Sequence, residues 1–189
     1  MQEKSDEQLM TAVQAGDQVA LAALVTRHHA PLLGYLYHLV GGDRQLSEDL
    51  VQETLLHVLR QHTYQAARPF KPWLYTIATN LARDYFKSAA VRKSRREGDA
   101  EEVLLHLYDS EPSPEERALV AEQGSEVRAA LAQLREEYRI VLALRFYQGF
   151  SLQEIAETLH IPLGTVKSRL SVGVHRLRSV LDPVQKGVD

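Results

Sequence analysis

The chain has 189 residues, of which 44% are hydrophobic and 25% charged, a composition typical of folded globular proteins rather than disordered or collagen-like chains. Its 22 Lys and Arg residues stand against 25 Asp and Glu residues, so a uniformly basic nucleic-acid-binding protein is excluded. The absence of cysteine excludes disulfides, thiolate metal sites and cysteine nucleophiles.

Targeting signals are missing from the sequence. The N-terminus lacks the apolar stretch of a signal peptide, and no apolar run approaches the roughly 18 residues that a membrane-spanning helix needs. We therefore expect a cytoplasmic protein with no membrane insertion.

Charge is segregated along the chain. Residues 83–96 carry six basic side chains and one acidic one, whereas residues 97–123 carry nine acidic side chains and one basic one. The acidic stretch also contains Pro112 and Pro114, which are typical of a linker. We expect two small domains, 1–95 and 114–183, joined by an acidic flexible linker at 96–113, and we expect the domains to tumble separately in the free protein.

Helical spacing recurs in nearly every apolar run, and sustained strand alternation is absent, which predicts an all-α fold. Ser5 and Gln8 form a capping box at the start of a first helix, which Gly16 ends. A second helix begins near Asp17, and Pro31 either kinks it or starts another.

Two further helices complete the N-terminal half. A turn at residues 41–43 precedes a third helix, and residues 62–70 form a loop because the residue before each proline disfavours helix. A fourth helix then begins near Pro72. The inward positions are Leu50, Val51, Thr54, Leu55, Val58 and Leu59 in the third helix, and Trp73, Ile77 and Leu81 in the fourth, with Tyr85 as a further candidate.

The C-terminal half also consists of helices. A cap at residues 113–116 starts one that runs to about Leu134, and another stops at Gly149. Ser151 and Glu154 form a second capping box, which opens a short helix before a turn at residues 160–164. The last helix has a regular inward stripe of Val166, Leu170, Val174, Leu177 and Leu181.

The two final helices and their tight turn have the pattern of a helix-turn-helix, with small Ala156 at the close approach and Ile161 in the turn. Arginine, hydroxyl and lysine side chains suit guanine edges, base edges and phosphates respectively. The last helix displays such groups opposite its apolar stripe, which predicts major-groove binding; an ordinary solvated basic helix is the alternative. These residues are Thr165, Ser168, Arg169 and Val172, with Lys167 and Arg176 beside them.

Signs of catalysis and of metal binding are weak. The eight histidines are scattered without metal-site spacing, and the sequence has no glycine-rich phosphate loop and no hydrolase or metalloprotease motif. Acidic neighbours such as Glu136 and Glu137 diverge on a helix and cannot converge on one substrate atom. We therefore expect no enzymatic activity, no cofactor and no metal site.

Five segments, in this order and separation, resemble the extracytoplasmic-function (ECF) sigma factors of bacterial RNA polymerase, within the sigma-70 family. They are residues 16–17, 48–54, 73–80, 151–156 and 164–170. The resemblance covers nearly the whole chain apart from the linker and tail. It implies that residues 1–95 form sigma region 2 and residues 114–183 form sigma region 4. It also implies a subunit that binds polymerase core and directs initiation at promoters with minus-10 and minus-35 elements.

The resemblance further implies partners and site residues. The expected partners are polymerase core, promoter DNA and an anti-sigma factor. Asp49, Gln52 and Glu53 would bind the coiled coil of the largest polymerase subunit; Gln65, Arg68, Asn80, Arg83 and Lys87 would bind the minus-10 element; and Thr165, Lys167, Ser168, Arg169, Ser171 and Arg176 would bind the minus-35 element. Tyr64 and Trp73 could stack on a base, but their apolar positions favour the core.

The chain departs from the family pattern at three places. Leu134-Arg135 stands where Leu-Pro is usual, His160 stands where glycine is common, and residues 172–174 lack the usual basic side chains. The third departure removes expected phosphate contacts and lowers the expected minus-35 affinity. Two other functions stay open: a stand-alone helix-turn-helix regulator, and a decoy that binds polymerase or an anti-sigma factor.

Overall fold

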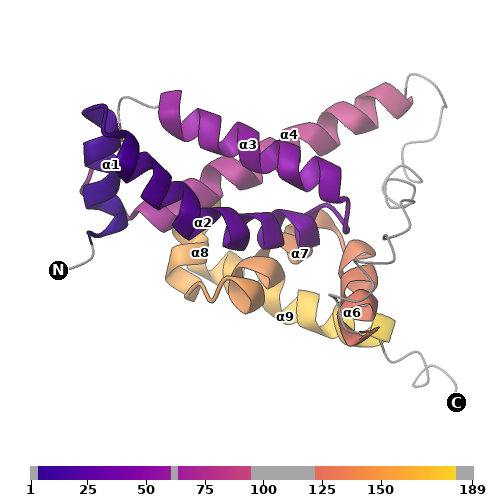
Figure 1. Ribbon diagram of the computed structural model, residues 1–189. Coiled ribbons are helices and arrows are strands. Elements are labelled where there is room, and N and C mark those ends of the chain that lie inside the picture. Colours follow the sequence, from indigo (N-terminus) through magenta and orange to yellow (C-terminus); the bar gives the residue numbers. More distant parts are fainter. Residues whose placement is uncertain (1–3, 61–63, 95–121, 182–189) are drawn as a thin grey trace, which may run out of the picture.

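The structure, a computed structural model, describes residues 4–60, 64–94 and 122–181, and every regular element in these ranges is helical (Figure 1). The predicted all-α fold is therefore confirmed. The linker at 96–113 and the cap at 113–116 lie outside the described residues. The helices are α1 (Asp6–Gln14), α2 (Gln18–Leu39), α3 (Arg44–Arg60), α4 (Phe70–Ser94), α6 (Glu122–Ala132), α7 (Glu136–Leu142), the π-helical turn η2 (Ala143–Tyr147), α8 (Leu152–Leu159) and α9 (Leu163–Leu181).

Both predicted capping boxes are present. The Gln8 N–H donates to Ser5 Oγ over 3.3 Å, and the Ser5 N–H donates to Gln8 Oε1 over 3.0 Å. Ser151 and Glu154 repeat the arrangement at 3.1 and 2.7 Å, and the hydrogen bond that the Ser151 N–H donates to the Glu154 carboxylate holds the pKa of Glu154 below its ordinary value. Each box satisfies N–H groups that a helix start leaves unpaired.

The turn between α2 and α3 also lies where the sequence predicts it, whereas α9 begins at Leu163, inside the turn predicted at residues 160–164. Gly41 and Gly42 have φ values of 74° and 97°, in the left-handed region that glycine adopts without a steric penalty. Of the alternatives at Pro31, the structure has a single helix, because α2 continues through that residue to Leu39.

The inward face of α4 differs from the predicted one. Its most buried side chains include Leu74, Tyr75 and Ala78, whereas Trp73 and Ile77 are half-buried. The prediction of Trp73, Ile77 and Leu81 as the inward face is therefore wrong, because the most buried face of α4 is rotated by about one residue from the predicted one. Figure 1 gives the reason: α8 lies against α4, so a second face of this helix is covered. Leu59 of α3, also predicted inward, is 39% exposed.

The N- and C-terminal halves pack against each other and share one hydrophobic core. The ring of Tyr75 in α4 meets Phe150 edge-on at 5.1 Å between centroids. The ring of His38 in α2 stacks on Tyr147 at 3.8 Å. The expectation that the halves tumble separately is therefore wrong for this structure, because apolar faces of both halves are buried against each other.

Candidate functional site

The exposed face of α3 carries the three residues expected to bind polymerase. Asp49, Gln52 and Glu53 are all exposed, at the i, i+3 and i+4 spacing that places them on one face. Leu56 continues this face one turn later and is 47% exposed, a position that sequence reasoning missed. The surface is thus acidic with an apolar residue at its edge.

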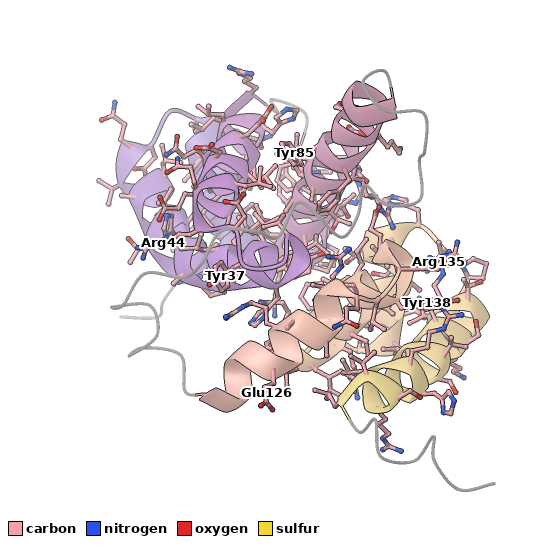
Figure 2. The ribbon with its side chains drawn as sticks, turned by 90° about the vertical axis from the view of Figure 1, so that its right-hand side faces the viewer. Tyr37, Arg44, Tyr85, Glu126, Arg135 and Tyr138 are labelled. Carbon is pink, nitrogen blue, oxygen red and sulfur yellow. The ribbon has the colours of Figure 1, made fainter. Side chains whose placement is uncertain are left out.

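An open groove of about 760 Å³ adjoins this face between α3 and α4. Glu53 lines it from α3, and Asp84 and Tyr85 line it from α4. In Figure 2, Tyr85 lies on α4, away from the C-terminal half. The groove therefore belongs to the N-terminal half alone.

The five predicted minus-10 residues are divided between a turn and α4. Gln65 and Arg68 are exposed, and the Arg68 N–H donates to the Gln65 carbonyl over 2.9 Å. Asn80 and Lys87 are exposed on α4, whereas Arg83 is half-buried. These residues thus come from neighbouring elements, with Arg83 deepest.

Tyr64 and Trp73 belong to an aromatic cluster with Phe70. The ring centroids of Tyr64 and Trp73 are 4.8 Å apart, and those of Phe70 and Trp73 are 5.7 Å apart. Tyr64 is 8% exposed, and its burial raises the pKa of its hydroxyl to about 12. The expected core position is confirmed for Tyr64, while Trp73 lies at the half-buried edge of the cluster.

The predicted minus-35 residues of α9 fall into two groups. Lys167, Ser168 and Ser171 point to solvent, and Val172 continues their stripe with 38% of its surface exposed. The other three lie beside neighbouring elements: Thr165 is half-buried, Arg169 pairs with Glu137 of α7, and the Arg176 guanidinium lies 4.9 Å from the centroid of the Tyr138 ring. Figure 2 shows Tyr138 beside α9.

Two adjacent glutamates at the start of α7 engage an arginine from each half. Glu136 Oε1 accepts from Arg83 Nε over 3.0 Å, and Glu137 Oε2 lies 3.1 Å from Arg169 Nη2. Sequence reasoning missed this role. It dismissed adjacent carboxylates as divergent, and that divergence is what lets each bind a different helix.

Two of the departures from the family pattern have structural consequences. His160 adopts φ 53°, so it takes the left-handed conformation that an unaltered turn requires. A Cβ on Gly173 would lie 3.2 Å from the Leu142 side chain, so glycine permits the close packing of α9 on α7.

In the described part of the chain, no group of three His, Asp or Glu residues could hold a metal ion. No described helix is long and apolar enough to cross a membrane.

Comparison with known proteins gives consistent matches. The family model Sigma-70 region 2 matches residues 24–96, and Sigma-70, region 4 matches residues 125–177. The ECF RNA polymerase sigma factor SigE of Mycolicibacterium smegmatis is 35% identical over 187 residues, covering 95% of this chain and 70% of that protein. SigL of Mycobacterium tuberculosis strain H37Rv is 36% identical over 170 residues, covering 88% of this chain and 92% of that protein.

Solved structures show the same fold. CnrH, solved with the cytosolic domain of CnrY, aligns with a TM-score of 0.72 at 23% identity, covering 96% of this chain and 99% of that chain. The sigma factor RpoE of Bartonella quintana, solved with the anti-sigma factor NepR, aligns with a TM-score of 0.63 at 26% identity. The alignment covers 84% of this chain and 94% of that chain.

Proposed function

The chain belongs to the ECF sigma factors of RNA polymerase, which direct promoter-specific transcription, and we propose that three of its surfaces divide this work. The exposed face of α3 binds polymerase core, the 64–87 segment binds the minus-10 element, and α9 binds the minus-35 element. The observation that carries the proposal is the solvent-facing stripe of Lys167, Ser168 and Ser171, which follows a capped α8 and a tight turn.

For core binding, Asp49 and Glu53 supply exposed carboxylates one turn apart. Carboxylates in this arrangement accept charge-assisted hydrogen bonds from arginines of a partner helix. Gln52 adds a neutral donor and acceptor between them. The coiled coil of the largest polymerase subunit is the partner that we propose for this face.

For the minus-10 element, an unpaired base must leave the stack and find protein groups that replace its lost partners. The exposed turn with Gln65 and Arg68 offers polar groups for such a base. Asn80, Arg83 and Lys87 then follow the opened strand along α4, where cations neutralise phosphates. Arg83 takes part once it has left Glu136.

For the minus-35 element, α9 is the recognition helix in the major groove. Lys167 neutralises a phosphate, while Ser168 and Ser171 offer hydroxyls to base edges. Arg169 reads a guanine after release from Glu137. Thr165 and Arg176 border this surface, at the first turn of α9 and beside α7 respectively.

We also propose an anti-sigma factor as a regulatory partner, since a relative of 26% identity was solved with one. We place the protein in the cytoplasm, where polymerase acts, and propose no enzymatic activity of its own. A stand-alone regulator is not favoured, because the region 2 family model matches residues 24–96.

The test combines pulldown of polymerase core with runoff transcription from the promoter upstream of the protein's own gene. We expect the chain to bind core and to start transcripts at one defined position. The matched control is the Lys167→Ala, Ser171→Ala variant, which should bind core normally but start fewer transcripts. Core binding without any promoter-specific transcript would indicate the decoy function, and DNA binding without core binding would indicate the stand-alone regulator.

A further inference from the structure

Gln148 joins the two halves through three hydrogen bonds. The Tyr75 hydroxyl donates to Gln148 Oε1 over 2.6 Å, and Gln148 Nε2 donates to the Pro31 carbonyl over 3.1 Å. Lys71 Nζ donates to the Gln148 carbonyl over 2.9 Å. One half-buried residue of the C-terminal half thereby holds both α2 and α4; we call these four residues the Gln148 latch.

A local departure from regular helix positions Gln148. The π-helical turn η2 follows α7, and the Gln148 N–H donates to the Ala143 carbonyl over 3.2 Å, five residues back. Such turns are rare and occur often at functional sites. Gly149 then reverses the chain with φ 69°. The geometry thus directs the Gln148 side chain at the N-terminal half rather than along the helix.

The same packing engages two of the proposed minus-10 residues. Arg83 is bonded to Glu136 over 3.0 Å, and Arg68 Nη2 lies 3.5 Å from His160 Nε2. Both partners belong to the C-terminal half. A promoter strand that uses these arginines must therefore displace contacts between the halves.

In the packed arrangement, the two proposed DNA-binding surfaces also lie too close together to reach both promoter elements at once. Elements named for positions minus-10 and minus-35 are about 25 base pairs apart, or roughly 85 Å along a duplex at 3.4 Å per base pair. Arg83 and Arg169 are bonded to consecutive residues of α7, whose Cα atoms are about 3.8 Å apart, so their guanidinium groups lie within roughly 20 Å. Both elements cannot be occupied in this conformation.

The proposed polymerase-binding face of α3, in contrast, remains exposed to solvent in the packed arrangement. Asp49, Gln52 and Glu53 are exposed on α3, and Figure 1 shows α3 on the side of the molecule opposite α9. Polymerase can therefore reach α3 before the halves separate.

From these contacts we propose that the free chain is held by the Gln148 latch in a closed, self-inhibited conformation, which polymerase core captures through α3 before the halves part. The inference rests on the proposed function for the roles of α3 and the arginines. The hydrogen bonds of the Gln148 latch compete with promoter binding, so the two halves separate only when a partner binds.

The test uses the absence of cysteine, because two introduced thiols can be labelled without background. Val19→Cys in α2 and Ser179→Cys in α9 place dyes at exposed positions in opposite halves. Single-molecule energy transfer then reports the distance between them. We expect the short-distance population to predominate over a minor long-distance one in the free chain, and the long-distance population to predominate once core is added.

Gln148→Ala removes two side-chain hydrogen bonds and Tyr75→Phe removes one without changing the ring. Since a net hydrogen bond of ordinary strength changes an equilibrium constant about fivefold, the ratio of open to closed molecules should rise roughly fivefold in Tyr75→Phe and more in Gln148→Ala. Gln153→Ala, on the exposed face of α8, is the matched control and should leave the ratio unchanged.

A third variant tests the order of events. Asp49→Lys with Glu53→Lys should stay closed when core is added. A free chain that is already open, or latch variants with the same distances as Gln153→Ala, would overturn the inference. Runoff transcription by the labelled chain separates the two proposals: if it starts transcripts while the distances contradict the latch, the sigma function stands and the latch fails.

Discussion

Lys167 and Arg169 are two residues apart in α9 but have different surroundings. Lys167 is exposed, whereas the Arg169 guanidinium lies against Glu137 and 24% of its side chain is exposed. An exposed lysine acts on phosphates as a point charge, while the planar fork of an arginine can bind a base edge with two hydrogen bonds once it has left its carboxylate partner. The two side chains therefore contribute differently to promoter binding.

We predict that Lys167→Ala weakens binding to all DNA sequences alike and lowers the salt slope of binding by about one. Arg169→Ala should instead cost roughly 1 to 3 kcal/mol at the correct promoter and relax discrimination at one or two minus-35 positions. Titrations against matched and mismatched promoter duplexes at several salt concentrations measure both effects. An equal, sequence-independent loss for both variants would rule out base reading by Arg169.

A second prediction concerns the partner of Arg169. Glu137→Gln should release the guanidinium and strengthen minus-35 binding by up to about 1 kcal/mol, the value of a partly exposed ion pair. Glu157→Gln, with the same change of charge on the exposed face of α8, serves as the control. If Glu137→Gln weakened binding, the ion pair would be needed to position α9 rather than to restrain Arg169.

His160 carries a conformational cost that glycine would not have. Its φ of 53° lies in the left-handed region, which costs a residue with a Cβ about 1 kcal/mol or more. We predict that His160→Gly stabilises the protein by about 1 kcal/mol and that His160→Ala does not. Thermal unfolding checks this, and a lower midpoint for His160→Gly would show that contacts of the imidazole outweigh the strain.

At the scale of elements, α3 shows how one helix serves two purposes. Leu50, Val51 and Thr54 face the core, while Asp49 and Glu53 face solvent. A change confined to the outer face should therefore alter binding without altering the fold.

We predict that Asp49→Lys with Glu53→Lys folds normally but loses core polymerase, because the reversed charges repel arginines of the partner. Circular dichroism checks the fold, and a binding titration checks affinity. Glu126→Lys with Glu157→Lys, at exposed positions of α6 and α8, is the matched control for the change in net charge. Unchanged affinity in the α3 variant would move the polymerase site elsewhere.

At the scale of the whole molecule, the junction between the halves contains a titratable group. His38 stacks on Tyr147 and its Nδ1 atom is buried. Burial lowers the pKa of His38 to about 4, and the nearby Arg128 guanidinium acts in the same direction. The ordinary pKa of histidine is about 6.5, so the folded protein binds this proton less readily than the unfolded chain does.

The stability contributed by neutral His38 is therefore present above pH 6.5 and is lost as the pH falls toward 4. We predict that the closed population decreases over this window in the wild type, and less in His38→Phe, which keeps a stacking ring without a titratable nitrogen. Energy transfer between the labels in α2 and α9 measures the difference. Identical pH profiles for the two proteins would exclude His38 as the source of the pH dependence of the closed population.

Local interactions explain what the sequence by itself determined. The two capping boxes and the glycine turn after α2 follow from contacts within five residues, so they could be predicted. The solvent-facing α3 residues and the stripe of Lys167, Ser168 and Ser171 likewise follow from helical spacing. The expected minus-10 residues rested on the family resemblance, which supplied roles that spacing alone does not give.

Tertiary structure decided the rest, because it depends on which surfaces meet. The buried face of α4 could not be derived from its own periodicity, since α8 covers a second face of that helix. Glu136 and Glu137 acquire their partners from α4 and α9, which lie 53 and 32 residues away in sequence. The Gln148 latch similarly requires α2 and α4 to be in place. Sequence patterns specify which face of a helix is apolar. The free energy of packing decides which neighbouring helix covers that face.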